Sequence, residues 1–206
     1  MKIKFRSAAA FFAMLCAIPA HAQYRTDEGV RPLPPTGSAP NQLVPAVAAD
    51  GNYATINRGI SRDQAAWHVR AALNVAALGC RDEAERETVA AYNALLSRHK
   101  GPLAAADAAV KAQYRVRYGA GWDSRHDRDM TRVYNFFAQP PAQTRFCHVA
   151  RDVLAEARGV SPDRFAAFAA DALPRLEAPF TDFYRDYDAW RIADRAWQGR
   201  LASARR

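Results

Sequence analysis

The fold class is decided by residues 181–201, TDFYRDYDAWRIADRAWQGRL. At 100° per residue, the large apolar side chains of this stretch fall within about 40° of one line, which is typical of an amphipathic α-helix. They are Phe183, Tyr187, Trp190, Trp197 and Leu201. From Ser61 onward the chain keeps a helical spacing and lacks the alternating Val, Ile and Thr of strands. The sequence therefore predicts an all-α protein.

Helix start and stop signals divide residues 61–206 into about seven helices. Gly119–Gly121 and Pro140–Pro141 each separate two of them, and Pro174 kinks or ends the sixth. The seventh begins near Thr181. Because the connections are short and no segment repeats, we expect a single compact helical bundle.

Residues 1–22 have the pattern of a cleavable signal peptide. Three basic residues precede an apolar run from Ala8 to Ala20, and the small residues Ala20 and Ala22 stand where a signal peptidase cuts. The run is shorter than the ~20 residues that span a bilayer. We therefore expect cleavage near Ala22, no transmembrane segment afterwards, and a mature protein that is periplasmic or secreted.

Residues 23–60 differ in composition from the rest of the chain. They contain five prolines and few large apolar residues, and they show no sustained period. This composition is typical of an extended or disordered segment. We therefore divide the chain into a signal peptide over 1–22, a disordered Pro-rich leader over 23–60 and an all-helical domain over 61–206.

Two cysteines, Cys80 and Cys147, remain after cleavage of the signal peptide. In an oxidising compartment such a pair predicts one disulfide, which would bring the first and fifth helices together. Neither cysteine has a second cysteine at the spacing of a zinc site, so a metal pair is the weaker interpretation.

The formal charge of the chain is +8, and it falls to about +5 when the three cations of the signal peptide are removed. An exported protein does not meet nucleic acid, so we expect no nucleic-acid partner. An envelope protein, or an anionic envelope polymer or lipid headgroup, fits both the compartment and the charge.

The densest polar cluster is WDSRHDRD, residues 122–129. Its simpler interpretation is a solvated helix start, in which Ser124 and Asp127 form a capping box. The alternative is a catalytic site in which His126 acts as a general base, oriented by a neighbouring carboxylate. The candidate catalytic residues are His126, Asp123, Asp127 and Asp129. We prefer the structural interpretation, because sequence proximity of His and Asp is a weak signal without geometry.

His126 and Met130 are four residues apart and could face one soft metal ion on a helix. Met130 also continues an apolar stripe through Val133 and Phe137, which is typical of core packing. Since no third ligand is evident, we expect neither a metal nor another cofactor.

Asp194 lies in the aromatic stripe of the last helix, between Trp190 and Trp197. A carboxylate at such a position must be paired, hydrated or protonated. The structural interpretation is a salt bridge to an arginine of another helix. The functional interpretation adds Asp194 to the candidate catalytic residues, as an acid in an aromatic cleft of the kind that holds sugars.

Arginines and tyrosines on both sides of Gly119–Gly121 form a basic, aromatic patch. The candidate ligand-binding residues are Arg115, Arg117, Arg125, Arg128 and Arg132, with Tyr114 and Tyr118 beside them. Together they could bind an anion, whereas the alternative is a solvated face on which the arginine stems cover apolar neighbours.

The sequence lacks the motifs of the familiar hydrolase and redox classes, including Gly-x-Ser-x-Gly, His-Glu-x-x-His and Cys-x-x-Cys. We therefore expect an exported, non-catalytic helical protein that acts as a binding or structural module on an envelope partner or an anionic envelope component. The alternative is a periplasmic hydrolase that uses the His126 cluster.

Overall fold

The computed structural model describes residues 29–39 and 41–204, and the predicted signal peptide lies outside them. Within these residues all regular structure is helical, apart from one isolated bridge between Val47 and Tyr53. The six α-helices are α1 Arg62–Gly79, α2 Glu85–Arg98, α3 Lys100–Tyr118, α4 Trp122–Phe137, α5 Gln143–Ala157 and α6 Phe165–Ala204. Short 3-10 helices, η1 Pro140–Ala142 and η2 Pro162–Arg164, precede α5 and α6. The all-α prediction is confirmed.

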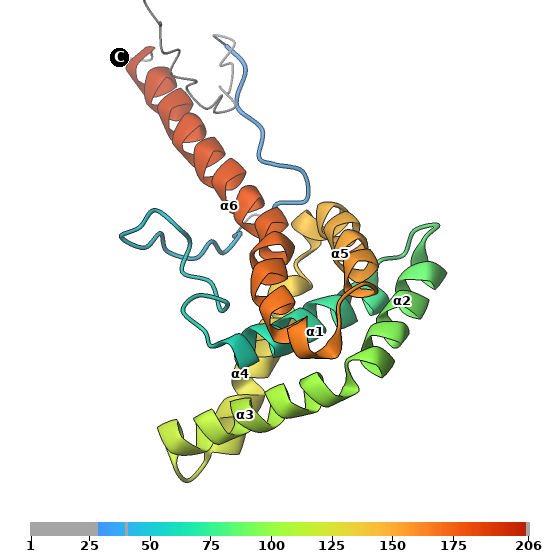
Figure 1. Cartoon of the computed structure of the whole chain (residues 1–206). Helices are drawn as coiled ribbons and strands as arrows, with labels where there is room; N and C mark the ends of the chain where they lie inside the picture. The colour runs from blue at the N-terminus through green and yellow to red at the C-terminus, as the bar shows by residue number, and fades with distance from the viewer. Residues whose placement is uncertain (1–28, 40, 205–206) are drawn as a thin grey trace, which may run out of the picture.

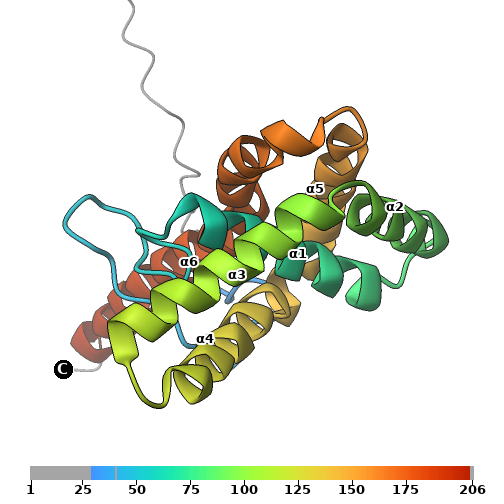
Figure 2. The same cartoon turned by 60° about the horizontal axis from the view of Figure 1, so that its bottom comes forward.

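Helix α1 is the centre of the bundle and contacts each of the other five α-helices (Figures 1 and 2). Six of its buried residues are alanines, whose small side chains let neighbouring helices approach closely. A capping box fixes its start: the Ser61 hydroxyl accepts from the Gln64 amide at 3.2 Å, and the Gln64 side chain accepts from the Ser61 amide at 3.1 Å.

Large aromatic side chains fill the space where α4, α5 and α6 meet. Phe136, Phe137, Phe146 and Phe180 lie with ring centroids 4.9–5.8 Å apart, in tilted, stacked and edge-to-face arrangements. All four are buried. Burial of aromatic rings dominates core energetics, so this cluster fixes α6 against the bundle.

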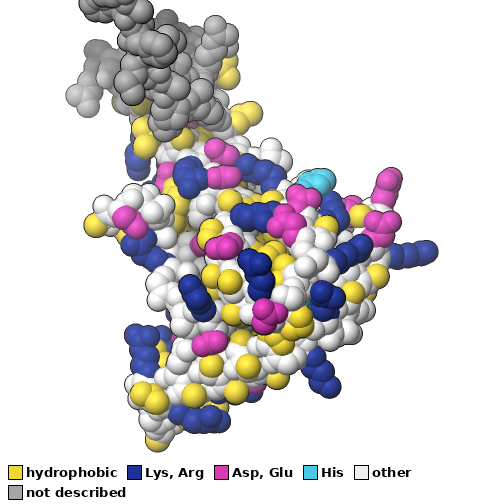
Figure 3. Space-filling view, viewed as in Figure 1, with side chains coloured by type: hydrophobic (Ala, Val, Ile, Leu, Met, Phe, Trp, Pro, Cys, Tyr) yellow, Lys and Arg dark blue, Asp and Glu magenta, His cyan; other side chains and the backbone are white. Residues whose placement is uncertain are grey.

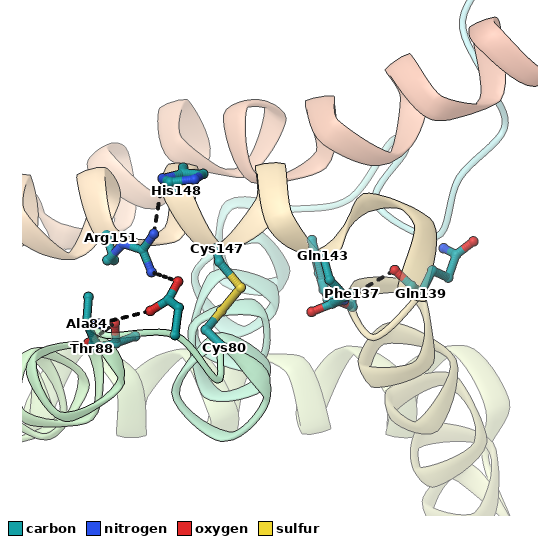
Figure 4. The surroundings of a disulfide bond; sticks show 10 residues. Cys80, Ala84, Thr88, Phe137, Gln139, Gln143, Cys147, His148 and Arg151 are labelled. Carbon is teal, nitrogen blue, oxygen red and sulfur yellow. Dashed lines mark hydrogen bonds and ion pairs between the residues drawn. A yellow bond between two sulfur atoms is a disulfide. The ribbon is translucent and has the colours of Figure 1, made fainter. Parts of the chain in front are cut away.

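A disulfide joins Cys80, just after α1, to Cys147 of α5, with 5.8 Å between the Cα atoms (Figure 4). This confirms the predicted pairing and the predicted proximity of the first and fifth helices. Arg151 of α5 donates to Asp82 at 2.8 Å next to the disulfide, and Gln143 donates to the Phe137 carbonyl at 2.7 Å (Figure 4). The second bond satisfies a carbonyl at the end of α4.

The prediction of about seven helices, with Pro174 and Thr181 between the last two, is wrong: a single 40-residue helix, α6, includes Pro174 and Pro179. Each proline removes one backbone donor and costs about 3 kcal/mol inside a helix. The buried face continues through both positions, however, with Leu173 and Leu176 around the first proline. Tertiary burial outweighs the local cost, and the ribbon changes direction in this stretch (Figure 2).

The predicted capping box of Ser124 and Asp127 is also wrong. Gly119 and Gly121 adopt positive φ of 57° and 82°, and Gly121 itself is the N-cap of α4. The helix therefore begins at Trp122, which places Ser124 inside its first turn. Left-handed glycines complete the reversal between α3 and α4 without a side-chain cap.

The described part of the leader, residues 29–39 and 41–60, runs beside α6 and then enters α1 (Figure 1). The Tyr53 hydroxyl donates to Asp188 of α6 at 2.9 Å, and its ring meets Tyr184 edge to face at 5.3 Å. None of the described helices has an apolar stretch long enough to span a membrane.

Candidate functional site

A cleft of about 240 Å³ opens between α1, the end of α3 and the start of α4, and the last part of the leader closes one side. We call it the arginine cleft. Its lining residues are Ile56, Ile60, Gln64, His68, Gln113, Tyr114, Arg117, Tyr118, Arg125, Asp129, Met130, Arg132 and Val133. Figure 3 shows Lys and Arg side chains around the end of the molecule where α3 meets α4. The arginine cleft is thus a hollow in a basic surface.

Asp129 is the one carboxylate of the arginine cleft, and it is buried. It accepts from the Tyr114 hydroxyl at 3.1 Å and from Arg125 Nε at 2.9 Å, and Arg132 lies at 3.6 Å. Burial, together with the charge of Asp129, raises the pKa of Tyr114 to about 12. Tyr114 therefore stays protonated and donates to Asp129.

Arg117 makes no ion pair with any described residue, and its guanidinium lies 5.5 Å from the centroid of the Tyr118 ring. Arg125 lies over the same ring at 5.4 Å. Arg117, Arg125 and Arg132 thus place three positive charges around the single negative charge of Asp129. The excess positive charge, carried on planar guanidinium forks beside an aromatic ring, suits an anionic ligand.

His68 forms the wall of the arginine cleft on α1, although it is only 3% exposed. Its Nδ1 lies 2.8 Å from Oδ1 of Asn57, a buried residue of the leader. Burial lowers the pKa of His68 to about 4, so the imidazole is neutral at physiological pH. The cleft therefore contains a neutral, hydrogen-bonded histidine beside its three arginines.

The four candidate catalytic residues of the 122–129 cluster do not converge. His126 is buried against the ring of Tyr114, and its Nδ1 lies 3.4 Å from the exposed Asp127. Nε2 of His126 is buried without a hydrogen bond to any described residue. Asp123 accepts from the Ser124 amide at 2.8 Å, and Asp129 faces the arginine cleft instead. The geometry gives His126 no orienting carboxylate apart from Asp127.

The five candidate ligand-binding arginines fall into two groups. Arg117, Arg125 and Arg132 line the arginine cleft. Arg115 lies outside it, with its guanidinium 4.3 Å from the centroid of the Trp122 ring, and Arg128 is exposed elsewhere on α4. The helical period separates them, because residues two positions apart on α3 point in different directions.

Asp194 is bound by the leader. Arg31 donates to both carboxylate oxygens, at 2.8 and 3.3 Å, and Gln198 donates at 2.6 Å. The Trp190 indole donates to the Pro32 carbonyl at 3.0 Å. The hydrogen bond from Arg31 holds the pKa of Asp194 below its usual value. The predicted salt bridge therefore exists, but its arginine comes from the leader and not from another helix.

Three polar lining residues, Gln64, His68 and Gln113, were not singled out from the sequence, and neither was Asn57, which contacts His68. Only His68 has a usable signal: it lies three residues after Ala65 and four before Ala72, on the buried side of α1. A histidine on such a side must be neutral or paired. The leader residue Asn57 gives no such periodic signal.

Within the described residues, no three His, Cys, Asp or Glu side chains come together in a way that could hold a metal ion. None of the residues that line the arginine cleft is a Ser, Thr or Cys nucleophile. The cleft combines arginine donors, a neutral histidine and aromatic surface.

Comparison of the chain with protein-family models, with curated proteins and with solved structures gives no match. Function is therefore argued from the arginine cleft itself.

Proposed function

We propose that the mature chain is an exported, non-catalytic binding module that takes an anionic envelope component in the arginine cleft. The observation that supports this proposal is the set of three arginines, Arg117, Arg125 and Arg132, around one carboxylate, Asp129. Arg117 has no ion-pair partner among the described residues, so a bound anion would give its guanidinium an ion-pair partner.

Isothermal titration calorimetry with an acidic sugar, D-galacturonate, tests the proposal, with neutral D-galactose as the matched probe. Galacturonate binds and galactose does not. The Arg117→Gln variant loses about tenfold in affinity, as expected for one hydrogen bond to a charged group. Arg115→Gln is the control on the same helix, since Arg115 lies over Trp122 outside the cleft, and it changes the affinity less than about twofold. Equal effects of the two variants, or equal binding of the two sugars, contradict the proposal.

Export is part of the same proposal. The disulfide between Cys80 and Cys147 is typical of an oxidising compartment, and the sequence of residues 1–22 has the signal-peptide pattern. Intact-mass analysis of protein purified from the envelope fraction should give a chain that begins at Gln23 and carries no free thiol. A mass that includes residues 1–22 contradicts cleavage.

The described residues provide no observation that favours the hydrolase alternative. His126 lies outside the residues that line the arginine cleft, and the one described carboxylate within 4 Å of its ring nitrogens is the exposed Asp127. We therefore do not propose an enzymatic role.

A further inference from the structure

The tautomer of His68 is set by its partner. Asn57 Oδ1 is a carbonyl oxygen and can only accept, so the proton between the two residues must be on Nδ1 of His68. Nε2 of the neutral ring then carries a lone pair. No described residue forms a hydrogen bond with Nε2, and the ring lines the arginine cleft. His68 is therefore a lining residue of the cleft with one ring nitrogen free to accept.

Glu177 of α6 lies near the Asn57 amide. The amide and the Thr55 hydroxyl are close enough to favour the charged form of Glu177, while burial is the largest influence and raises the pKa of this carboxyl above its usual value. Asn57 Nδ2 and Glu177 Oε1 are both buried, and neither has a hydrogen-bond partner among the described residues. The orientation of the amide that the structure shows places Oδ1 at His68 Nδ1.

Two glutamine side chains carry amide NH₂ groups, which are donors and so complement the acceptor on His68. Gln64 uses its oxygen on the Ser61 amide, and Gln113 uses its oxygen on the Ser61 hydroxyl. Both residues line the arginine cleft, and the NH₂ groups that these two bonds leave unused are donors among its lining residues. The lining thus includes one neutral acceptor, on His68, and two amide donors. This is the pattern that hydroxyl groups satisfy, because a hydroxyl both donates and accepts.

We propose that the arginine cleft selects anions that carry hydroxyl groups, that is, acidic sugars, and that His68 Nε2 accepts a hydrogen bond from one of these hydroxyls. This inference rests on the proposed anion binding and narrows its ligand class. The volume of about 240 Å³ lies below the ~300–1,000 Å³ of most drug-sized sites, so the cleft holds one sugar unit of a chain and not a longer segment.

Three probes separate the contribution of the carboxylate charge from that of the hydroxyl groups. D-galacturonate has both, cyclohexanecarboxylate has the charge alone, and D-galactose has the hydroxyl groups alone. In titration calorimetry the wild-type protein binds galacturonate about tenfold more tightly than cyclohexanecarboxylate. The His68→Phe variant reduces this preference, the ratio of the two affinities measured on the same variant, to about twofold or less. An unchanged preference in His68→Phe overturns the role of His68.

Failure of the inference and failure of the proposed function give different results. If the wild-type protein binds both anions equally, the selection of acidic sugars is wrong and anion binding stands. If neither anion binds, both proposals are wrong.

A second measurement on the wild-type protein does not depend on the folding of His68→Phe. In ¹⁵N spectra of the histidine rings, free His68 shows a proton on Nδ1 and none on Nε2. Galacturonate shifts the Nε2 resonance and cyclohexanecarboxylate does not. A proton on Nε2 of the free protein, or an equal shift with both probes, overturns the proposal.

Discussion

Asp129 and Asp194 are both buried carboxylates on the inner side of a helix, and each accepts hydrogen bonds from an arginine. Asp194 is matched by the single arginine Arg31, which belongs to a segment 163 residues away and covers the helix. Asp129 is held by Arg125, one helical turn away, and further arginines lie beside an open volume. A buried acid thus closes a contact between the leader and α6 in one region and lines an open cleft in the other. The two regions differ because the cleft has more arginines than carboxylates and an open volume beside them.

Both regions belong to the helical bundle that the disulfide ties together, so the largest expected effect comes from removing this disulfide. Replacement of both Cys80 and Cys147 by Ser removes the tie between α1 and α5 and lowers the free energy of unfolding by about 2–4 kcal/mol. Chemical denaturation monitored by circular dichroism measures this loss. A denaturation midpoint unchanged from that of the oxidised wild type would show that the stability of the bundle does not depend on the disulfide.

The next effect concerns Asp129. Asp129→Ala leaves the Tyr114 hydroxyl and Arg125 without their acceptor, and we expect the free energy of unfolding to fall by about 1–3 kcal/mol. The control is Asp127→Ala, whose side chain is 82% exposed, with an expected change within about 0.5 kcal/mol. Equal losses in the two variants would mean that the buried network contributes nothing.

Removal of the Asp194 carboxylate should loosen the leader and leave the helical bundle intact. Asp194→Ala removes the acceptor of Arg31, so limited proteolysis within residues 29–39 becomes at least several-fold faster, while the helical core resists as before. Asp186→Ala is the control, because Asp186 lies on the same helix with an exposed arginine 3.6 Å away. Cleavage rates that match in the two variants would remove Asp194 as the anchor of the leader.

Acid should give the smallest of these effects. The pKa of Asp194 is lowered in the folded protein, so its contribution is complete above the unfolded pKa of about 4 and is lost as the pH falls through the lower, folded pKa. The indole resonance of Trp190, which donates to Pro32, reports detachment of the leader. We expect it to be constant from pH 7 to pH 5 and to shift only below about pH 4. A midpoint near pH 6 would point to a histidine instead.

The features that the sequence predicted correctly depend on local periodicity or on simple counting. The 100° spacing of the apolar residues and the lack of strand patterns gave the all-α class, and the two cysteines outside the predicted signal peptide gave one disulfide. The helix through Pro174 and Pro179 was missed, because burial of its apolar face depends on neighbours that local rules do not contain.

The candidate site was predictable only in part. Three of the five candidate arginines line the cleft, because clustering of Arg and Tyr around Gly119–Gly121 is visible in sequence. The pairs Arg31–Asp194 and Asn57–His68 were not, since each joins the leader to a helix through a tertiary contact. His68 could have been suspected from its place on the buried side of α1, but its partner and its tautomer required the structure.

The most direct test of the contrast between the two carboxylates is a ¹⁵N–¹H titration of the wild-type protein with D-galacturonate. The account predicts saturable shifts in residues 113–118 and 125–133, around the arginine cleft, and none in residues 190–198, where the leader already occupies Asp194. Shifts centred on residues 190–198, or no saturable shift in either region, would contradict it.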